Sequence, residues 1–215
     1  MKFLRSVAAL GALVAAVTAQ ASVVGSLGGG FGSFLSLSAA SALVGAGGTL
    51  GGSFAAISNG TIYSSDQPFA DIPAGLVFQS KFLSAGPGPN NAEPTTLHIN
   101  GSGTPYISFL WGSPDTYNQL TVVSTHAGGG SPDMQSFTTA SLGLPGDGNQ
   151  SFSAYVRFQG LAGSLITDLI FNNNPAINAF ETANYTITPV PEPETYALML
   201  AGLGVIGFIA RRRRS

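Results

Sequence analysis

The chain of 215 residues contains no cysteine, few charged residues and a single tryptophan. Without cysteine it can form neither disulfide bonds nor zinc–thiolate sites, and it cannot use a cysteine nucleophile. Its stability must therefore come from burial alone. A body of about 140 to 170 residues is long enough to enclose one hydrophobic core.

Basic residues are almost missing from the middle of the chain. Between Ser22 and Val190 only Lys81 and Arg157 are basic, against eight acidic residues, so the region carries a net charge of about −6 (two minus eight). The acids are Asp66, Asp71, Glu93, Asp115, Asp133, Asp147, Asp168 and Glu181. Nucleic-acid binding needs a basic surface, so this composition argues against nucleic acid, and equally against an anionic membrane surface, as a partner.

Residues 1–21 have the order of a secretory signal peptide. Lys2 and Arg5 precede an uncharged apolar run from Val7 to Val17, and the small-x-small sequence Ala19-Gln20-Ala21 follows. We therefore expect a signal helix that is cleaved before Ser22. The alternative, a buried N-terminal helix, does not account for this order of charge, apolar core and cleavage site.

Residues 189–215 combine three features in series. Pro191, Glu192 and Pro193 come first, the 16 apolar or small residues at 195–210 follow, and a basic end completes the chain. The basic residues are Arg211, Arg212, Arg213 and Arg214. As a helix, the apolar run spans about 24 Å, short of a hydrocarbon core of about 30 Å. We expect a weak transmembrane helix whose arginines stay cytoplasmic and whose body lies outside.

This C-terminal arrangement resembles the PEP-CTERM sorting signal. The resemblance implies recognition by exosortase, a membrane-embedded peptidase or transpeptidase, in a Gram-negative bacterium that makes extracellular polysaccharide. It also implies a precursor held transiently in the inner membrane, removal of the tail, and display at the cell surface or release. The alternative is an ordinary single-pass anchor with incidental prolines.

Residues 54–188 are predicted to form an all-β body. Short apolar runs are separated by turn sequences such as Asn100-Gly101, and within 152–158 apolar and polar side chains alternate. Ala183, Tyr185 and Ile187 alternate with polar residues in the same way. The candidate strands are Phe54–Ile57, Thr61–Ser64, Leu76–Phe82, Thr95–Ile99, Tyr106–Trp111, Gln119–Thr125, Gln135–Thr139, Phe152–Phe158, Leu165–Phe171 and Ala183–Thr188. We expect a two-layer antiparallel β-sandwich, jelly-roll-like, preceded at 22–53 by a Gly/Ser/Ala-rich segment with one or two strands.

Four blocks of the body resemble one family of exosortase-dependent surface proteins. The longest is Ser-Phe-Leu-Trp-Gly-Ser-Pro-Asp-Thr-Tyr-Asn at 108–118. The others are Phe82–Pro87, Asn149–Phe152 and Asn178–Glu181. The family is defined by sorting and surface location, so the resemblance implies no particular activity.

The block at 108–118 holds the candidate ligand-binding residues of the body: Trp111, Asp115, Tyr117 and Asn118. In one interpretation Trp111 and Tyr117 offer aromatic faces to a sugar, while Asp115 and Asn118 bind turn amides or donate oxygens to calcium. In the favoured interpretation Trp111 packs in the core and Asp115 caps a turn. Burial of Trp111 distinguishes the two.

Signals for catalysis and cofactors are weak. His98 and His126 are the only histidines, no G-x-S-x-G sequence occurs, and Asp147-Gly148-Asn149 is too short for an EF-hand loop. We therefore expect no catalytic residue, cofactor or metal, with calcium as the open alternative. The overall prediction is a non-enzymatic exported matrix protein associated with exopolysaccharide; a carbohydrate-binding module and then a secreted hydrolase are the alternatives.

Overall fold

The computed structural model describes residues 21–30, 33–35, 37, 54–86, 94–126, 129–175, 177–187 and 203. The expected signal peptide up to Gln20, the tripeptide Pro191-Glu192-Pro193, and the arginines at 211–214 lie outside these residues, as does the run at 195–210 apart from Leu203. Within the described part of the chain, no helix is long and apolar enough to cross a membrane.

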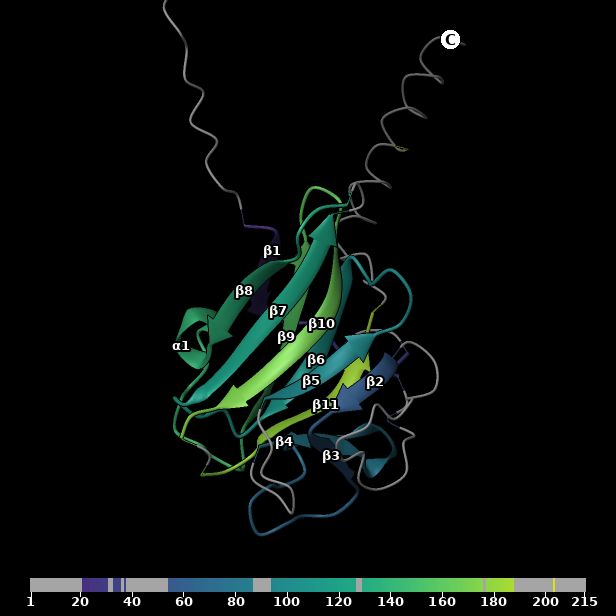
Figure 1. The fold of residues 1–215 in the computed structure, drawn as a ribbon. Coiled ribbons are helices and arrows are strands. Elements are labelled where there is room, and N and C mark those ends of the chain that lie inside the picture. Colours follow the sequence, from purple (N-terminus) through teal and green to yellow (C-terminus); the bar gives the residue numbers. More distant parts are fainter. Residues whose placement is uncertain are drawn as a thin grey trace, which may run out of the picture.

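The described strands form two antiparallel sheets packed face to face (Figure 1). The six-stranded sheet has the order β1 (Val23–Leu27), β9 (Ser153–Gly160), β6 (Tyr106–Gly112), β11 (Phe180–Thr186), β4 (Phe82–Ala85) and β3 (Gly60–Tyr63). The five-stranded sheet has the order β2 (Phe54–Ser58), β5 (Thr95–Ile99), β10 (Ser164–Asn173), β7 (Asn118–His126) and β8 (Asp133–Thr138). The predicted all-β, two-layer antiparallel sandwich is confirmed.

Between residues 21 and 187, the helical structure that is described is limited to two single turns. α1 (Thr139–Leu142) follows β8, and η1 (Phe78–Ser80) precedes β4. The side chain of Thr138 accepts from the backbone N–H of Ser141, and Gly143 ends α1 in the left-handed conformation with φ 72°. Both ends of this short helix are therefore capped by local sequence.

The six-stranded sheet draws one strand from the Gly/Ser/Ala-rich segment at 22–53. β1 pairs antiparallel with β9 over its whole length, from Val23 opposite Gly160 to Leu27 opposite Val156. Val23 is fully buried, whereas Val24 and Leu27 are each 47 % exposed on this edge strand. The sandwich thus begins immediately after the expected cleavage position.

The alternating apolar side chains of β9 face the core, as predicted. Val156 and Phe158 are fully buried in the main cluster between the sheets, and Phe152 and Ala154 pack against it. The intervening Tyr155 faces the other side of the sheet, where it packs against a second cluster. The period of two in this segment is therefore a reliable guide to its inner face.

The six-stranded sheet is covered on its outer face as well. All residues of β6 and β11 are buried, because the segment between β3 and β4 folds across them. Ala70 and Val77 of that segment contact Phe82, Leu110 and Ala183 in the second cluster. Strands buried on both faces lose the alternating pattern that marks a half-exposed strand.

The prediction of a strand over Leu76–Phe82 is wrong. Leu76 is 87 % exposed, Gln79 and Ser80 have φ of 57° and 50°, and β4 begins only at Phe82. The side chain of Asn184 binds this loop from β11: it accepts from the Phe78 N–H at 2.7 Å and donates to the Leu76 carbonyl at 2.7 Å. The side chain of Asn184, rather than a neighbouring strand, therefore forms the hydrogen bonds to the backbone of this loop.

The expectation that Ala183, Tyr185 and Ile187 share one face is also wrong. Asn184 has φ of 53°, and the register of β11 against β6 shifts between Ala183 and Thr186. As a result Ala183 packs in the second cluster while Tyr185 lies in the main core. One left-handed residue thus reverses the facing of the strand.

Candidate functional site at the end formed by residues 112–118

The block at 108–118 ends β6 and leads into β7 through a tight turn. The N–H of Asn118 donates to the carbonyl of Asp115 at 3.1 Å, and the N–H of Asp115 donates to Asn118 Oδ1 at 2.8 Å. The side chain that caps this turn is therefore that of Asn118, not that of Asp115. Its position is set by burial, since Asn118 is 1 % exposed.

A chain of buried amides joins the two sheets beneath this turn. Asn118 Nδ2 donates to Asn173 Oδ1 at 2.9 Å, and Asn173 Nδ2 donates to the carbonyls of Ala85 at 2.8 Å and Asn178 at 3.2 Å. Asn173 is 2 % exposed and ends β10, whereas Ala85 ends β4 in the other sheet. Buried polar groups are stable only when satisfied, so this chain keeps the end of the sandwich in one arrangement.

Asp115 points away from its own turn. It forms an isolated antiparallel bridge with Asp147, and its carboxylate lies against Gly148, where an added Cβ would come within 2.6 Å of Oδ1. Burial, with the hydrogen bond and negative charge of Asp115, raises the pKa of Tyr117 above the ordinary value for a phenol. The Tyr117 side chain is consequently neutral and held by Asp115.

Trp111 lies in the core. It is fully buried, and its ring stacks on Phe180 with centroids 4.1 Å apart and an interplanar angle of 26°. No face of the indole is available to a sugar in this position. Of the three aromatic residues in the block, Phe109 and Trp111 are fully buried and only Tyr117 is partly exposed.

Glu181 is a buried carboxyl group that sequence reasoning did not single out. It is 2 % exposed and accepts from Ser113 Oγ at 2.8 Å. Burial, opposed by the Ser113 hydrogen bond and assisted by the charge of Asp71, raises its pKa to about 8. The side chain is therefore mostly protonated at neutral pH.

Three of the sequence blocks meet around Glu181. A cavity of about 30 Å³ is lined by Ser113 and Asp115 from the first, Gln150 from the second, and Asn178 and Glu181 from the third. Two carboxyl groups in one cavity are the arrangement a glycosidase uses. However, this volume corresponds to about one water molecule, so it admits no sugar.

A larger, open hollow lies beside this cavity on the five-stranded sheet. Its volume is about 220 Å³, and it forms where β7 begins and where β8 and β10 end. The lining residues are Thr116, Tyr117, Asn118, Gln119, Thr138, Asn172 and Asn174. All of them are uncharged and polar. Tyr117 and Asn118 were predicted to bind ligand. The side chain of Asn118, however, already forms hydrogen bonds with Asp115 and Asn173 inside the protein.

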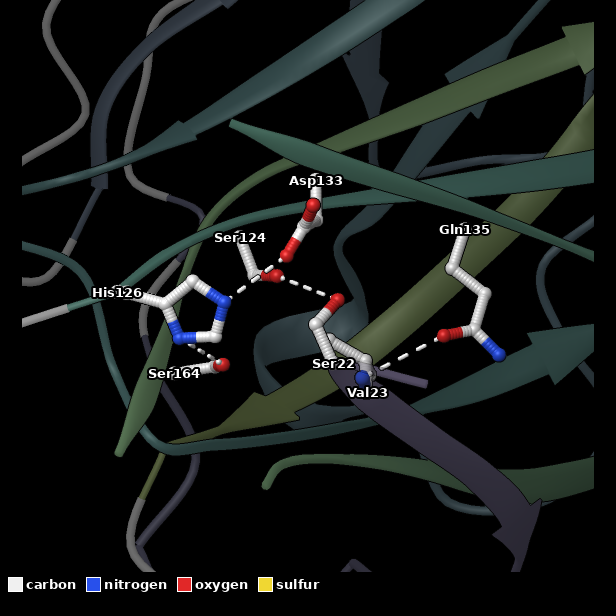
Figure 2. Close-up of polar contacts among 7 residues, drawn as sticks. All are labelled: Ser22, Val23, Ser124, His126, Asp133, Gln135 and Ser164. Atoms are coloured by element: carbon white, nitrogen blue, oxygen red, sulfur yellow. Dashed lines mark hydrogen bonds and ion pairs between the residues drawn. The ribbon is translucent and has the colours of Figure 1, made fainter. Parts of the chain in front are cut away.

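The opposite end of the sandwich holds a Ser–His–acid chain (Figure 2). Ser164 Oγ lies 3.2 Å from His126 Nδ1, and His126 Nε2 lies 3.1 Å from Asp133 Oδ2. These residue types make up a hydrolytic triad. Ser164 is only 1 % exposed, so a substrate cannot reach its hydroxyl group, and the chain joins β7, β8 and β10 instead.

The other histidine is also paired with an aspartate. His98 Nδ1 contacts Asp168 Oδ1 between β5 and β10. In the described ranges, no group of three or more histidine, aspartate or glutamate residues could hold a metal ion. Asp147 and Asn149 instead accept the N–H groups of Asn149 at 3.3 Å and Ser151 at 3.0 Å, which is turn chemistry.

Comparisons with known proteins identify the C-terminus. The described fold defines a small β-sandwich protein. The sequence feature that says most about its function, the C-terminal motif, lies outside the sandwich. A family model for the PEP-CTERM protein-sorting motif matches residues 189–214, so this chain carries a PEP-CTERM sorting domain. No curated protein and no solved structure matches the chain. The motif marks an exosortase-processed protein that is first anchored in a membrane and then located at the surface or outside the cell.

Proposed function

We propose that the protein is a non-catalytic component of the extracellular matrix that associates with exopolysaccharide and needs no cofactor. Its sandwich, jelly-roll-like in this proposal, is exported behind a cleaved signal helix and held by a transmembrane helix at about 195–210 until exosortase removes the tail. The observation that carries the proposal is the PEP-CTERM motif at residues 189–214. The acidic body, without a basic surface, is consistent with a polysaccharide rather than a nucleic-acid partner.

The start of the sandwich supports cleavage before Ser22. Ala21 is exposed, but Ser22 is 9 % exposed, accepts from Ser124 Oγ at 3.0 Å, and its carbonyl accepts from the Leu161 N–H at 2.8 Å. Figure 2 shows Ser22 beside Ser124 and Val23 beside Gln135. A peptidase requires an accessible chain, so cleavage must precede the docking of β1.

The mature protein is therefore expected to begin at Ser22. Replacing Ala19 by arginine should abolish cleavage, because the small-x-small site is lost, and should leave a precursor that is 21 residues longer. Mass spectrometry of the N-terminal peptide checks both results. A mature chain that starts beyond Val23 would contradict the proposal, since it would lack part of the paired strand β1.

Replacing Pro191-Glu192-Pro193 by three alanines is expected to stop C-terminal processing almost completely. The two prolines are expected to keep the backbone ahead of the proposed helix extended, and in this proposal the motif is the part that exosortase recognises. Nearly all of the protein should then remain in the membrane fraction with its tail. The measurement is mass spectrometry of the C-terminus together with fractionation of the cells.

A matched substitution outside the motif separates recognition from a general defect. Thr188→Ala lies one residue before the matched region and should leave processing at the wild-type level. If the triple-alanine variant had the same mature C-terminus as the wild type, the sorting role of the tripeptide would be wrong.

A carbohydrate-binding module is the second candidate function. Burial of Trp111 removes the sugar-stacking role proposed for that residue, so the hypothesis depends on other groups. The observation in its favour is the open, uncharged hollow beside Tyr117. A secreted hydrolase has no comparable support, because the carboxyl pair of Asp115 and Glu181 encloses space for about one water.

A further inference from the structure

Three strands bring their side chains to the hollow in one row. Gln119 of β7 is opposite Thr138 of β8 and also opposite Asn172 of β10. Side chains that are opposite one another in antiparallel strands point to the same face. Since the next residue, Leu120, is fully buried in the core, Gln119 and its two neighbours point outward.

Three amide groups in and next to this row are available for a ligand. Within the part of the chain that the structure describes, the side chains of Gln119, Asn172 and Asn174 make no hydrogen bond, and all three line the hollow. Each carboxamide offers both N–H donors and a carbonyl acceptor. A set of donors and acceptors without formal charge is suited to a ligand that presents many hydroxyl groups.

Tyr117 supplies a fixed aromatic wall next to these amides. Its hydroxyl group interacts with Asp115 and Asn178, and its carbonyl accepts from the Asn174 N–H at 3.3 Å. A ring held at both ends loses little conformational entropy when a ligand packs on it. The aromatic wall is therefore preorganised for a ligand.

The geometry points to this hollow as a metal-independent binding site for one ring of an uncharged polysaccharide, an inference that rests on the proposed association with exopolysaccharide. Its volume of about 220 Å³ corresponds to roughly seven waters and is smaller than the ~300–1,000 Å³ of typical cofactor and drug sites. The hollow thus fits a single ring of a longer chain. No charged side chain lines it, and the surrounding acidic body repels uronic-acid polymers.

The test uses the processed protein purified from producing cells, in affinity electrophoresis through gels that contain dextran, galactomannan or alginate. Saturation-transfer NMR with the methyl pyranosides of glucose, galactose and mannose identifies the ring. We expect retardation by a neutral polysaccharide, unchanged by EDTA, and none by anionic alginate. The double variant Gln119→Ala/Asn172→Ala should lose at least about tenfold in affinity, because two amide contacts disappear.

Gln159→Ala is the matched control. Gln159 is also an exposed amide, but it lies on β9 in the other sheet, and its substitution should leave binding unchanged. Equal urea midpoints for the wild type and both variants show that the fold is intact. Binding that is absent from both neutral gels, abolished by EDTA, confined to alginate, or equal in wild type and double variant overturns the inference.

Fractionation of the same cultures tests the proposed function separately. If the wild-type protein does not sediment with the extracellular polysaccharide, the matrix association itself is wrong. If the wild type and the double variant sediment equally and bind the gels equally, the matrix association stands and the hollow is not its binding site.

Discussion

Replacing Trp111 by alanine is expected to lower the free energy of unfolding by about 3 to 5 kcal/mol. Trp111 is fully buried in the main core, and the substitution leaves a cavity against the ring of Phe180, which in turn contacts Phe171 with centroids 5.0 Å apart. Urea unfolding followed by circular dichroism measures the loss. Trp111 is the only tryptophan, so its fluorescence reports directly on the core of the wild-type protein.

Trp111→Phe separates the packing of this residue from its polar atom. The indole N–H is buried and has no hydrogen-bond partner among the described residues. Phenylalanine loses part of the volume but also removes this unsatisfied donor, so the expected loss is small, about 1 kcal/mol. If alanine were tolerated as well as phenylalanine, Trp111 would not be a core residue. Glycan binding should be unchanged in Trp111→Phe, because the ring does not reach the hollow.

The sandwich was predictable from local pattern, whereas its strand order was not. Alternation in 152–158 and the turn at Asn100-Gly101 predict half-buried strands, and those segments are β9 and the end of β5. However, β1 pairs with β9 across more than a hundred residues, and β6 lies between β9 and β11. Such pairings depend on long-range packing, for which a single sequence carries no local signal.

The two errors in the body share one physical cause. Asn184 adopts a left-handed backbone conformation, which shifts β11, and its amide satisfies the loop at 76–78 in place of a neighbouring strand. Asparagine tolerates this conformation better than most residues, but nothing local indicates that it will adopt it within a strand. The alternating pattern at 183–187 was therefore misleading.

The candidate site was predictable in part. The block at 108–118 does lie at one end of the sandwich, and Tyr117 lines the hollow. The amides of Gln119, Asn172 and Asn174 were not predictable as a set, because only the register of β10 against β7 brings them together. The protonation of Glu181 depends on its burial under the segment at 68–71, and burial by a distant segment cannot be predicted from composition.

Glu181 is expected to make the protein less stable as the pH rises from about 4.5 to about 8. Its pKa is about 8 in the folded protein, against 4.5 for an ordinary glutamate, so between these values the folded state binds the proton and the unfolded state does not. Stability then falls with increasing pH, because the native state binds more protons than the unfolded state. The total fall is about 3 to 5 kcal/mol, present in full below pH 4.5 and lost by about pH 8.

Glu181→Gln should remove this fall, because the amide is uncharged at every pH and its carbonyl can still accept from Ser113 Oγ. At pH 9 the variant should be more stable than the wild type by a few kcal/mol, and at pH 4.5 the two should differ little. Urea unfolding at pH 4.5, 6, 7.5 and 9 gives the free energy of unfolding of both proteins as a function of pH, and the difference between the two curves reports the ionisation of Glu181. Asp147→Asn, an equivalent change at an exposed acid of the same end, should keep the wild-type slope. Parallel curves for the wild type and Glu181→Gln would mean that Glu181 is solvated in the folded protein and that the cover formed by residues 68–71 does not exclude water.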